Sequence, residues 1–192
     1  MQVLSLNRGR AQTLVTAQGS VPSSIRKRAV STELLVGPEG LEGDEQADLS
    51  VHGGPSKAVY AYPSEHYPFW ATVRAQAGLA AWDAGLPWGA MGENLSLQGL
   101  LETQVWQGDR LCFEGGLELV VSEPRQPCFK FNAVMGFAQA GRAMAVAGCC
   151  GYYLAVDRPG TIAAGQTATL VAGQRGLSIA QAFAGKFAKH AR

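Results

Sequence analysis

Short runs of apolar residues dominate the chain and predict a fold built mainly from β-strands. Residues 1–6, 58–62, 105–113 and 116–121 place apolar side chains at alternate or successive positions, as half-buried and fully buried strands do. Glycine-rich turns separate many of these runs. Many short strands with few helices indicate a mainly β (α+β) fold with a barrel-like core.

The chain offers only a few helices, which we expect to lie around this core. Residues 63–77 begin with a proline that suits the first turn of a helix, and residues 129–146 are rich in alanine and methionine and predict one helix. Ser178 is placed to cap a short C-terminal helix. The apolar stripe of that helix is formed by Ile179, Phe183 and Phe187. The polar segment 7–24 is expected to be a loop.

Composition indicates a compact protein without a strong electrostatic field. Of the 192 residues, 47% are hydrophobic and 16% charged, which suits one domain at residues 1–172 with a helical tail at 173–192. Sixteen basic residues balance fifteen acidic ones, so we expect neither nucleic acid nor a membrane as partner. The first residues lack a secretory signal, which predicts a cytoplasmic protein.

The cysteines form neither a disulfide framework nor a zinc motif. No Cys-x-x-Cys pair occurs, and the three histidines have no zinc-ligand spacing, so a structural zinc site is not expected. We expect the thiols to be reduced. They are Cys112, Cys128, Cys149 and Cys150.

The segment Ser-Glu-Pro-Arg-Gln-Pro-Cys-Phe-Lys, residues 122–130, is the strongest candidate for chemistry. Its two prolines are expected to end the strand before them and to present Cys128 between Arg125 and Lys130. Nearby positive charge favours the thiolate, which attacks electrophiles and binds soft metals. The alternative is a buried cysteine that acts as a small apolar side chain.

A second candidate segment is His-Gly-Gly-Pro-Ser-Lys at residues 52–57. Paired glycines can turn backbone N–H groups towards an anion, and the serine hydroxyl and lysine ammonium add donors. The candidate anion ligands are Gly53, Gly54, Ser56 and Lys57. The spacing is not that of a P-loop, and a tight turn that requires glycine explains the segment equally well. His52 is either a proton donor or a structural histidine.

A third polar pair lies in the turn at residues 91–96. Glu93 and Asn94 can hydrogen-bond to the backbone of that turn, or they can contact a polar ligand.

Taken together and in order, these motifs resemble the MOSC domain, in its YiiM-like branch. The resemblance runs from about residue 3 to residue 171. It is carried by Gly40-Leu-x-Gly-Asp44, Gln46-Ala-Asp48, His52-Gly-Gly-Pro-x-Lys-Ala58, Tyr62-Pro63, Gly92-Glu-Asn-Leu95, Pro124-Arg-x-Pro-Cys128 and Gly151-Tyr-Tyr. Longer YiiM-like chains carry a helical C-terminal extension, whereas this chain has room for a single helix after residue 176.

The resemblance implies a pyruvate-kinase-barrel-like β-barrel that binds the pterin-based molybdenum cofactor. Cys128 would ligate the metal, and His52 or Glu93 would supply a proton. The cofactor-binding residues would be Gly53, Gly54, Ser56, Lys57, Asn94 and Arg125. Protein made in an ordinary overproducing host is expected to lack the cofactor. The same resemblance links the chain to pyridoxal phosphate binding and to detoxification.

The implied reaction is reductive dehydroxylation of N-hydroxylated compounds such as hydroxylaminopurines and amidoximes. Its partners would be this small-molecule substrate and an electron-donor reductase protein, with the chain acting as a monomer or homodimer. Two alternatives stay open. Cys128 could carry a persulfide without turnover of a small molecule, or the barrel could hold a vestigial site. The sequence assigns no role to Cys149 and Cys150.

Overall fold

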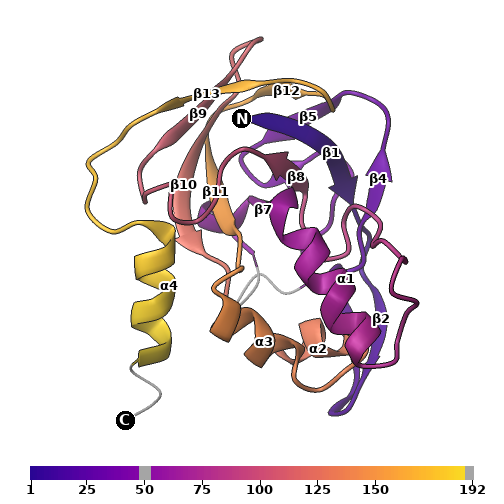
Figure 1. The fold of residues 1–192 in the computed structure, drawn as a ribbon. Coiled ribbons are helices and arrows are strands. Elements are labelled where there is room, and N and C mark those ends of the chain that lie inside the picture. Colours follow the sequence, from indigo (N-terminus) through magenta and orange to yellow (C-terminus); the bar gives the residue numbers. More distant parts are fainter. Residues whose placement is uncertain (48–52, 189–192) are drawn as a thin grey trace.

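The fold is organised around one strongly curved eight-stranded sheet (Figure 1). The computed structural model describes residues 1–47 and 53–188. All neighbouring strands of this sheet are antiparallel except β7 and β8, which run parallel. The strand order is β13 (Ala168–Val171), β9 (Arg110–Phe113), β10 (Glu118–Pro124), β11 (Tyr152–Arg158), β7 (Val59–Pro63), β8 (Leu95–Gln98), β1 (Gln2–Arg8) and β4 (Arg28–Val30).

The sheet curls until the segment leading into β13 meets β1. Gln2 and Thr167 form an isolated antiparallel bridge, and the Val3 N–H donates to the Gln166 carbonyl at 2.9 Å. Among the described residues no continuous ladder joins these two strands, so the sheet is barrel-like without being closed. The predicted mainly β class is confirmed.

Two smaller sheets complete the β-structure. One contains β12 (Gly160–Ile162), β5 (Leu34–Gly37) and β6 (Gly40–Leu41), and the other is a hairpin of β2 (Gln12–Thr16) and β3 (Gly19–Ser23). The prediction of a loop over residues 7–24 is therefore wrong. Leu14 is the only apolar side chain of this hairpin that is buried, so the segment lacks the apolar alternation of a core strand.

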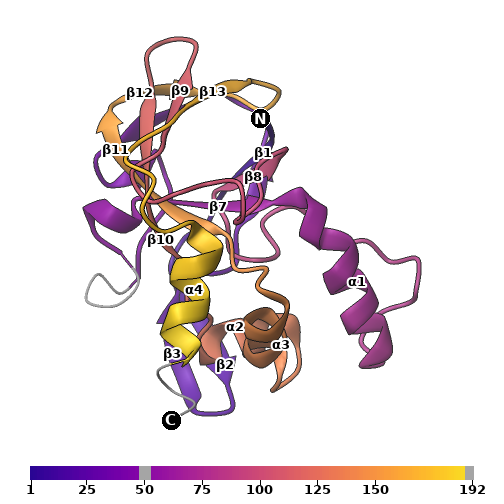
Figure 2. The same ribbon diagram turned by 60° about the vertical axis from the view of Figure 1, so that its left-hand side comes forward.

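The helices gather outside the curved sheet. Figure 2 shows α1 on one side, and α2, α3 and α4 at one end beside the β2–β3 hairpin. Their bounds are α1 (Tyr67–Gln76), α2 (Phe129–Met135), α3 (Ala140–Ala147) and α4 (Ile179–Ala188), with 3-10 turns η1 (Pro55–Lys57) and η2 (Ser64–His66). No helix in the described ranges is long and apolar enough to cross a bilayer.

The single helix predicted for residues 129–146 is in fact two helices. Gly136 adopts a left-handed conformation (φ 86°) that ends α2, and its N–H donates to the Asn132 carbonyl. The side-chain oxygen of Asn132 accepts the Gly141 N–H at 2.7 Å and so holds α3 against α2. The glycine therefore acts as a helix terminator.

The C-terminal helix begins as the sequence predicts. The Ser178 hydroxyl accepts the Gln181 N–H at 3.2 Å, and the Gln181 side chain accepts the Ser178 N–H at 2.9 Å, forming a reciprocal cap. Ile179 and Phe183 are buried. The Ile179 N–H also donates to the Val105 carbonyl, so α4 is joined to the rest of the body. The division at residue 172 stays a prediction.

Buried tyrosines of β7 fix the start of β11. The Tyr60 hydroxyl donates to the Cys150 carbonyl at 2.8 Å, and the Tyr62 hydroxyl donates to the Cys149 carbonyl at 3.0 Å. The Trp70 indole N–H donates to the Tyr62 hydroxyl at 2.6 Å. Because buried polar groups need partners, these bonds give the Cys149–Cys150 backbone a structural role that the sequence did not reveal.

Gly151 lets the β11 backbone approach β7. It has φ +64°, and a Cβ built there would lie 2.5 Å from the Ala61 carbonyl and under 3 Å from two tyrosine rings. Gly148 has a similar φ of +70°, but it has open space around it. A side chain would therefore be strained at both positions, but it would meet neighbouring atoms only at Gly151.

We predict that Gly151→Ala lowers the free energy of unfolding by about 3 kcal/mol or more, because left-handed strain and overpacking add. Gly148→Ala is the matched control, and it should cost only about 1–2 kcal/mol from the strain. Denaturant unfolding of both variants measures the difference. Equal losses would show that the β7–β11 approach tolerates a methyl group.

Candidate functional site

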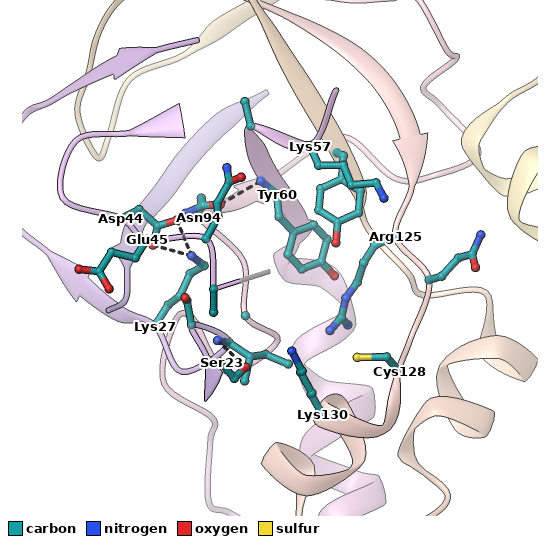
Figure 3. A pocket seen from close by; sticks show the side chains of 18 residues that line it. Ser23, Lys27, Asp44, Glu45, Lys57, Tyr60, Asn94, Arg125, Cys128 and Lys130 are labelled. Carbon is teal, nitrogen blue, oxygen red and sulfur yellow. Dashed lines mark hydrogen bonds and ion pairs between the residues drawn. The ribbon is translucent and has the colours of Figure 1, made fainter. Parts of the chain in front are cut away.

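One open cavity collects most of the polar residues that the sequence singled out (Figure 3). It encloses about 690 Å³ of empty space, part of which is open to solvent. Its walls come from residues 23–27 at the end of β3, from 44–47, from 57–60, from Gly92 and Asn94, from 125–130 after β10 and from Tyr153 of β11. Segments far apart in the sequence thus meet here.

The end of β10 positions Cys128. A bulge between Val121 and Glu123 keeps β10 paired with β11 as far as Pro124, which lies opposite Tyr152. The strand therefore ends at the first of the two prolines, three residues later than the end of the apolar run at residues 116–121. The chain then crosses to α2, where Cys128 occupies the N-cap position with an extended backbone and a half-buried side chain.

Arg125 is a buried cation held by aromatic rings. Its side chain is 5% exposed, and its guanidinium carbon lies 5.2 Å from the ring centre of Tyr60 and 4.6 Å from that of Phe131. Burial alone would lower the pKa of Arg125, but nearby tyrosines and Cys128 raise it. No carboxylate of the described residues forms an ion pair with it.

A second buried cation, Lys27, is neutralised locally. Its ammonium lies 2.5 Å from one oxygen of Asp44, and the Asn94 amide donates to the other oxygen at 2.8 Å. The side-chain oxygen of Asn94 accepts the Tyr60 backbone N–H at 3.0 Å. Burial lowers the pKa of Lys27, and Asp44 opposes that shift. Asn94 lines the cavity, and its side chain connects the segments of Asn7, Asp44 and Tyr60.

Sequence reasoning missed Lys27 as a site residue. Nothing in its own segment marks it, because its place at the cavity depends on the position of the β2–β3 hairpin. The only available signal is Asp44, which belongs to the glycine-flanked motif of residues 40–44.

Of the four anion ligands predicted in the loop at residues 53–57, Lys57 is the one that lines the cavity. The Gly54 N–H donates to the Gln46 side chain at 2.9 Å, and Ser56 is exposed. Lys57 lies 4.0 Å from a carboxylate oxygen of Glu123 and 5.9 Å from the ring centre of Tyr153. His52, the predicted proton donor, falls outside the described residues.

Glu93 lies away from the cavity lining and holds a turn. Its buried carboxylate accepts the backbone N–H groups of Gly89 at 2.8 Å and Met91 at 3.0 Å, and the Ser96 hydroxyl at 2.7 Å. The Tyr67 hydroxyl is a fourth donor. Burial raises the pKa of Glu93, and these hydrogen bonds oppose the shift. The structure gives Glu93 a structural position, and a proton-donating role is not carried further.

The four thiols differ in accessibility. Cys149 and Cys150 are buried, and burial raises the pKa of both, to about 11 for Cys149. Cys112 and Cys128 are half-buried, and only Cys128 lines the cavity. The described part of the chain holds no group of three His, Cys, Asp or Glu side chains that could bind a metal ion.

A second cavity adjoins the first one and shares Cys128, Lys57, Gln126 and Tyr153 with it. Glu123 lines this second cavity and lies 3.2 Å from the Lys186 ammonium of α4. The Cys128 thiol thus lies where the two cavities meet.

A family model of the MOSC domain matches residues 48–169, which include the loop at 53–57 and Cys128. This chain belongs to the MOSC domain family. The assignment agrees with the resemblance seen in the sequence.

Relatives of this MOSC-domain chain cover most of its length. The uncharacterized protein YflK of Bacillus subtilis is 37% identical over 92% of this chain and 76% of its own. YiiM of Escherichia coli is 39% identical over 85% of this chain and 70% of its own. A protein named "Reductase" from Gibberella moniliformis is 33% identical over 80% of this chain but only 26% of its own.

A solved structure shows the same fold. YiiM from Geobacillus stearothermophilus superposes with a TM-score of 0.77 at 31% identity, covering 100% of this chain and 86% of that one. None of these descriptions names pyridoxal phosphate or detoxification, so neither is carried further.

We predict that Cys128 is alkylated faster than the other three thiols. At pH 8 a thiol with a pKa of about 11 is ionised in only about one molecule in a thousand, so Cys149 should stay unmodified. Limiting alkylator followed by peptide mass spectrometry measures the order, with half-buried Cys112 as the internal comparison. Preferential labelling of Cys112 or of the Cys149–Cys150 pair would contradict this.

We predict that Glu93→Gln destabilises the fold by about 1–3 kcal/mol, because an amide NH₂ would face donors that now bind a carboxylate. Thermal or denaturant unfolding measures the loss. Glu33→Gln is the control, since Glu33 is exposed and accepts a hydrogen bond from the Thr161 hydroxyl. A variant as stable as its parent would show that the turn does not depend on the carboxylate.

Proposed function

We propose that this MOSC-domain protein is an oxidoreductase that binds the molybdenum cofactor and reduces N-hydroxylated compounds. One observation carries the proposal: the Cys128 thiol opens into a cavity that also holds the buried guanidinium of Arg125. Membership of the MOSC family and the relative named "Reductase" support the redox direction.

The residues present fit such a cofactor. Thiolate is a soft ligand, and one thiolate suits a metal whose remaining ligands come from the cofactor itself. Arg125 offers a planar fork for a phosphate or a pterin carbonyl. The rings of Tyr60 and Tyr153 line the cavity and present apolar faces to a flat heterocycle.

The bound cofactor would supply the two electrons that removal of a nitrogen-bound oxygen requires. The protein's own part is positioning. Cys128 would orient the metal end, and Arg125, locked between two rings, would fix the cofactor's polar edge without much loss of side-chain entropy. The proton for the leaving oxygen stays assigned to His52, as a prediction.

The proposal includes two partners, a small N-hydroxylated substrate and an electron-donor protein. The second cavity meets the first at Cys128, so a reactant can approach the thiol from a side that the cofactor does not fill. This supports a site with room for both cofactor and substrate.

We predict that Cys128→Ser lowers reductive turnover by about 100-fold or more, because serine is a harder ligand than thiolate and stays protonated at neutral pH. Cys112→Ser is the matched control, and it should keep parental turnover. The assay is reduction of 6-hydroxylaminopurine by protein from a cofactor-competent host, with a chemical reductant as electron source. Metal analysis of the same samples gives the molybdenum content.

Two results would overturn this function. Full turnover in Cys128→Ser would remove the thiol from the reaction. Cyanide-releasable sulfur on Cys128 in protein that binds no molybdenum would instead support the sulfur carrier.

A further inference from the structure

Ser24 belongs to the cavity wall, and its buried hydroxyl has no hydrogen-bond partner among the described residues. Ser24 is 9% exposed and lines the cavity, and its oxygen makes no hydrogen bond within the described part of the chain. Leaving a buried hydroxyl unpaired costs about 1–3 kcal/mol, and most such groups are paired. An oxygen of a bound ligand would provide the missing partner.

Two buried cations line the same cavity. Lys130 is 8% exposed, and its ammonium donates to the Pro22 carbonyl at 3.3 Å, two residues before Ser24. Arg125 contacts aromatic rings and the sulfur of Met144, at 3.7 Å. Figure 3 shows the nitrogen ends of Arg125 and Lys130 directed towards the same part of the cavity. Neither cation forms an ion pair with a carboxylate of the described residues.

The other two cations of the cavity lie close to carboxylates. Lys27 is 2.5 Å from Asp44, and Lys57 is 4.0 Å from Glu123. A buried charge without a counter-ion is costly. A bound anion is therefore stabilised most beside cations that no carboxylate already neutralises. This criterion separates Arg125 and Lys130 from Lys27 and Lys57.

We propose that the corner formed by Ser24, Arg125 and Lys130 binds the phosphate group of a phosphate monoester. A phosphate monoester dianion has three terminal oxygens that accept hydrogen bonds. The Arg125 guanidinium, the Lys130 ammonium and the Ser24 hydroxyl are the donors that these oxygens need. The sequence suggested the loop at residues 53–57 for this task, but the Gly54 N–H is bonded to Gln46 and Lys57 is near Glu123.

The inference deepens the proposed function by placing the cofactor's phosphate at this corner. It rests on that function for the identity of the ligand, but phosphate recognition needs no molybdenum. Another phosphate monoester would present the same terminal phosphate oxygens to Ser24, Arg125 and Lys130 as the cofactor does. The test therefore measures phosphate binding and ligand identity separately.

The test titrates cofactor-free protein with phenyl phosphate and follows binding by calorimetry. Lys130→Met should weaken binding about 10- to 100-fold, the loss of one charge-assisted hydrogen bond. Lys57→Met makes the same substitution in the same cavity, and it should change the affinity by less than about threefold if its charge is already neutralised. Parental protein that fails to bind phenyl phosphate, or an order reversed between the two lysines, would overturn the inference.

Ser24→Ala separates a ligand-binding role from a structural one. It should weaken phenyl phosphate binding about 2- to 10-fold, the worth of one neutral hydrogen bond, yet leave the free energy of unfolding unchanged or higher. Weaker binding without loss of stability supports the inference, and unchanged binding contradicts it. This variant keeps the test decisive even where Lys130→Met does not fold.

Ligand identity is tested on protein from a cofactor-competent host. Acid release of a fluorescent pterin from the parent, and less of it from Lys130→Met, assigns the corner to the cofactor's phosphate. Phenyl phosphate binding at this corner in protein that never carries pterin would sink the proposed function while the anion site stands. Pterin retained equally by parent and Lys130→Met would sink the anion site while the function stands.

Discussion

The pairing of β10 with β11 is the constraint on which the site depends. It continues through a bulge to the pair Pro124–Tyr152, so the last residue of one strand faces the first residue of the other. Arg125 and Cys128 leave the sheet from one partner, and Tyr153 faces the cavity from the other. Tyrosine hydroxyls of β7 donate to the backbone just before β11, and these bonds fix the end of the β10–β11 pair that lies at the cavity. The cavity wall is thus an extension of regular strand geometry.

The cavity is divided by charge. Lys27 and Lys57 have carboxylates within ion-pair distance, so they act mainly to hold the chain segments around them. Arg125 and Lys130 lie instead beside aromatic rings, a thioether and a carbonyl. An anion is therefore attracted more strongly to Arg125 and Lys130 than to Lys27 and Lys57. This difference in attraction is larger at low dielectric than in water, because less solvent screens the charges. One small volume can therefore combine a rigid frame with a strong local preference for anions.

The sequence predicted much of the fold but only part of the site. The mainly β class, the helix after Pro63 and the capped C-terminal helix follow from local patterns, and the structure contains all three. The cysteine at the end of a strand also follows, because proline restricts what comes before it. Ser24 and Lys27 gave no local signal, since their place in the cavity wall depends on how a weakly apolar hairpin packs. Lys130 was singled out only for its charge near Cys128. The sequence left two roles open for Glu93, and its hydrogen bonds match the one in which the carboxylate holds the turn.

The contact between β1 and the segment before β13 bears on how the chain folds during synthesis. The Gln2 side chain donates to the Gly165 carbonyl, a partner 163 positions later in the chain. A nascent chain therefore carries a first strand that cannot complete its bonds until nearly all the later residues have left the ribosome. Contacts of such long range slow folding and leave a strand edge exposed in the meantime. The same contact that completes the barrel-like body makes its assembly a late event.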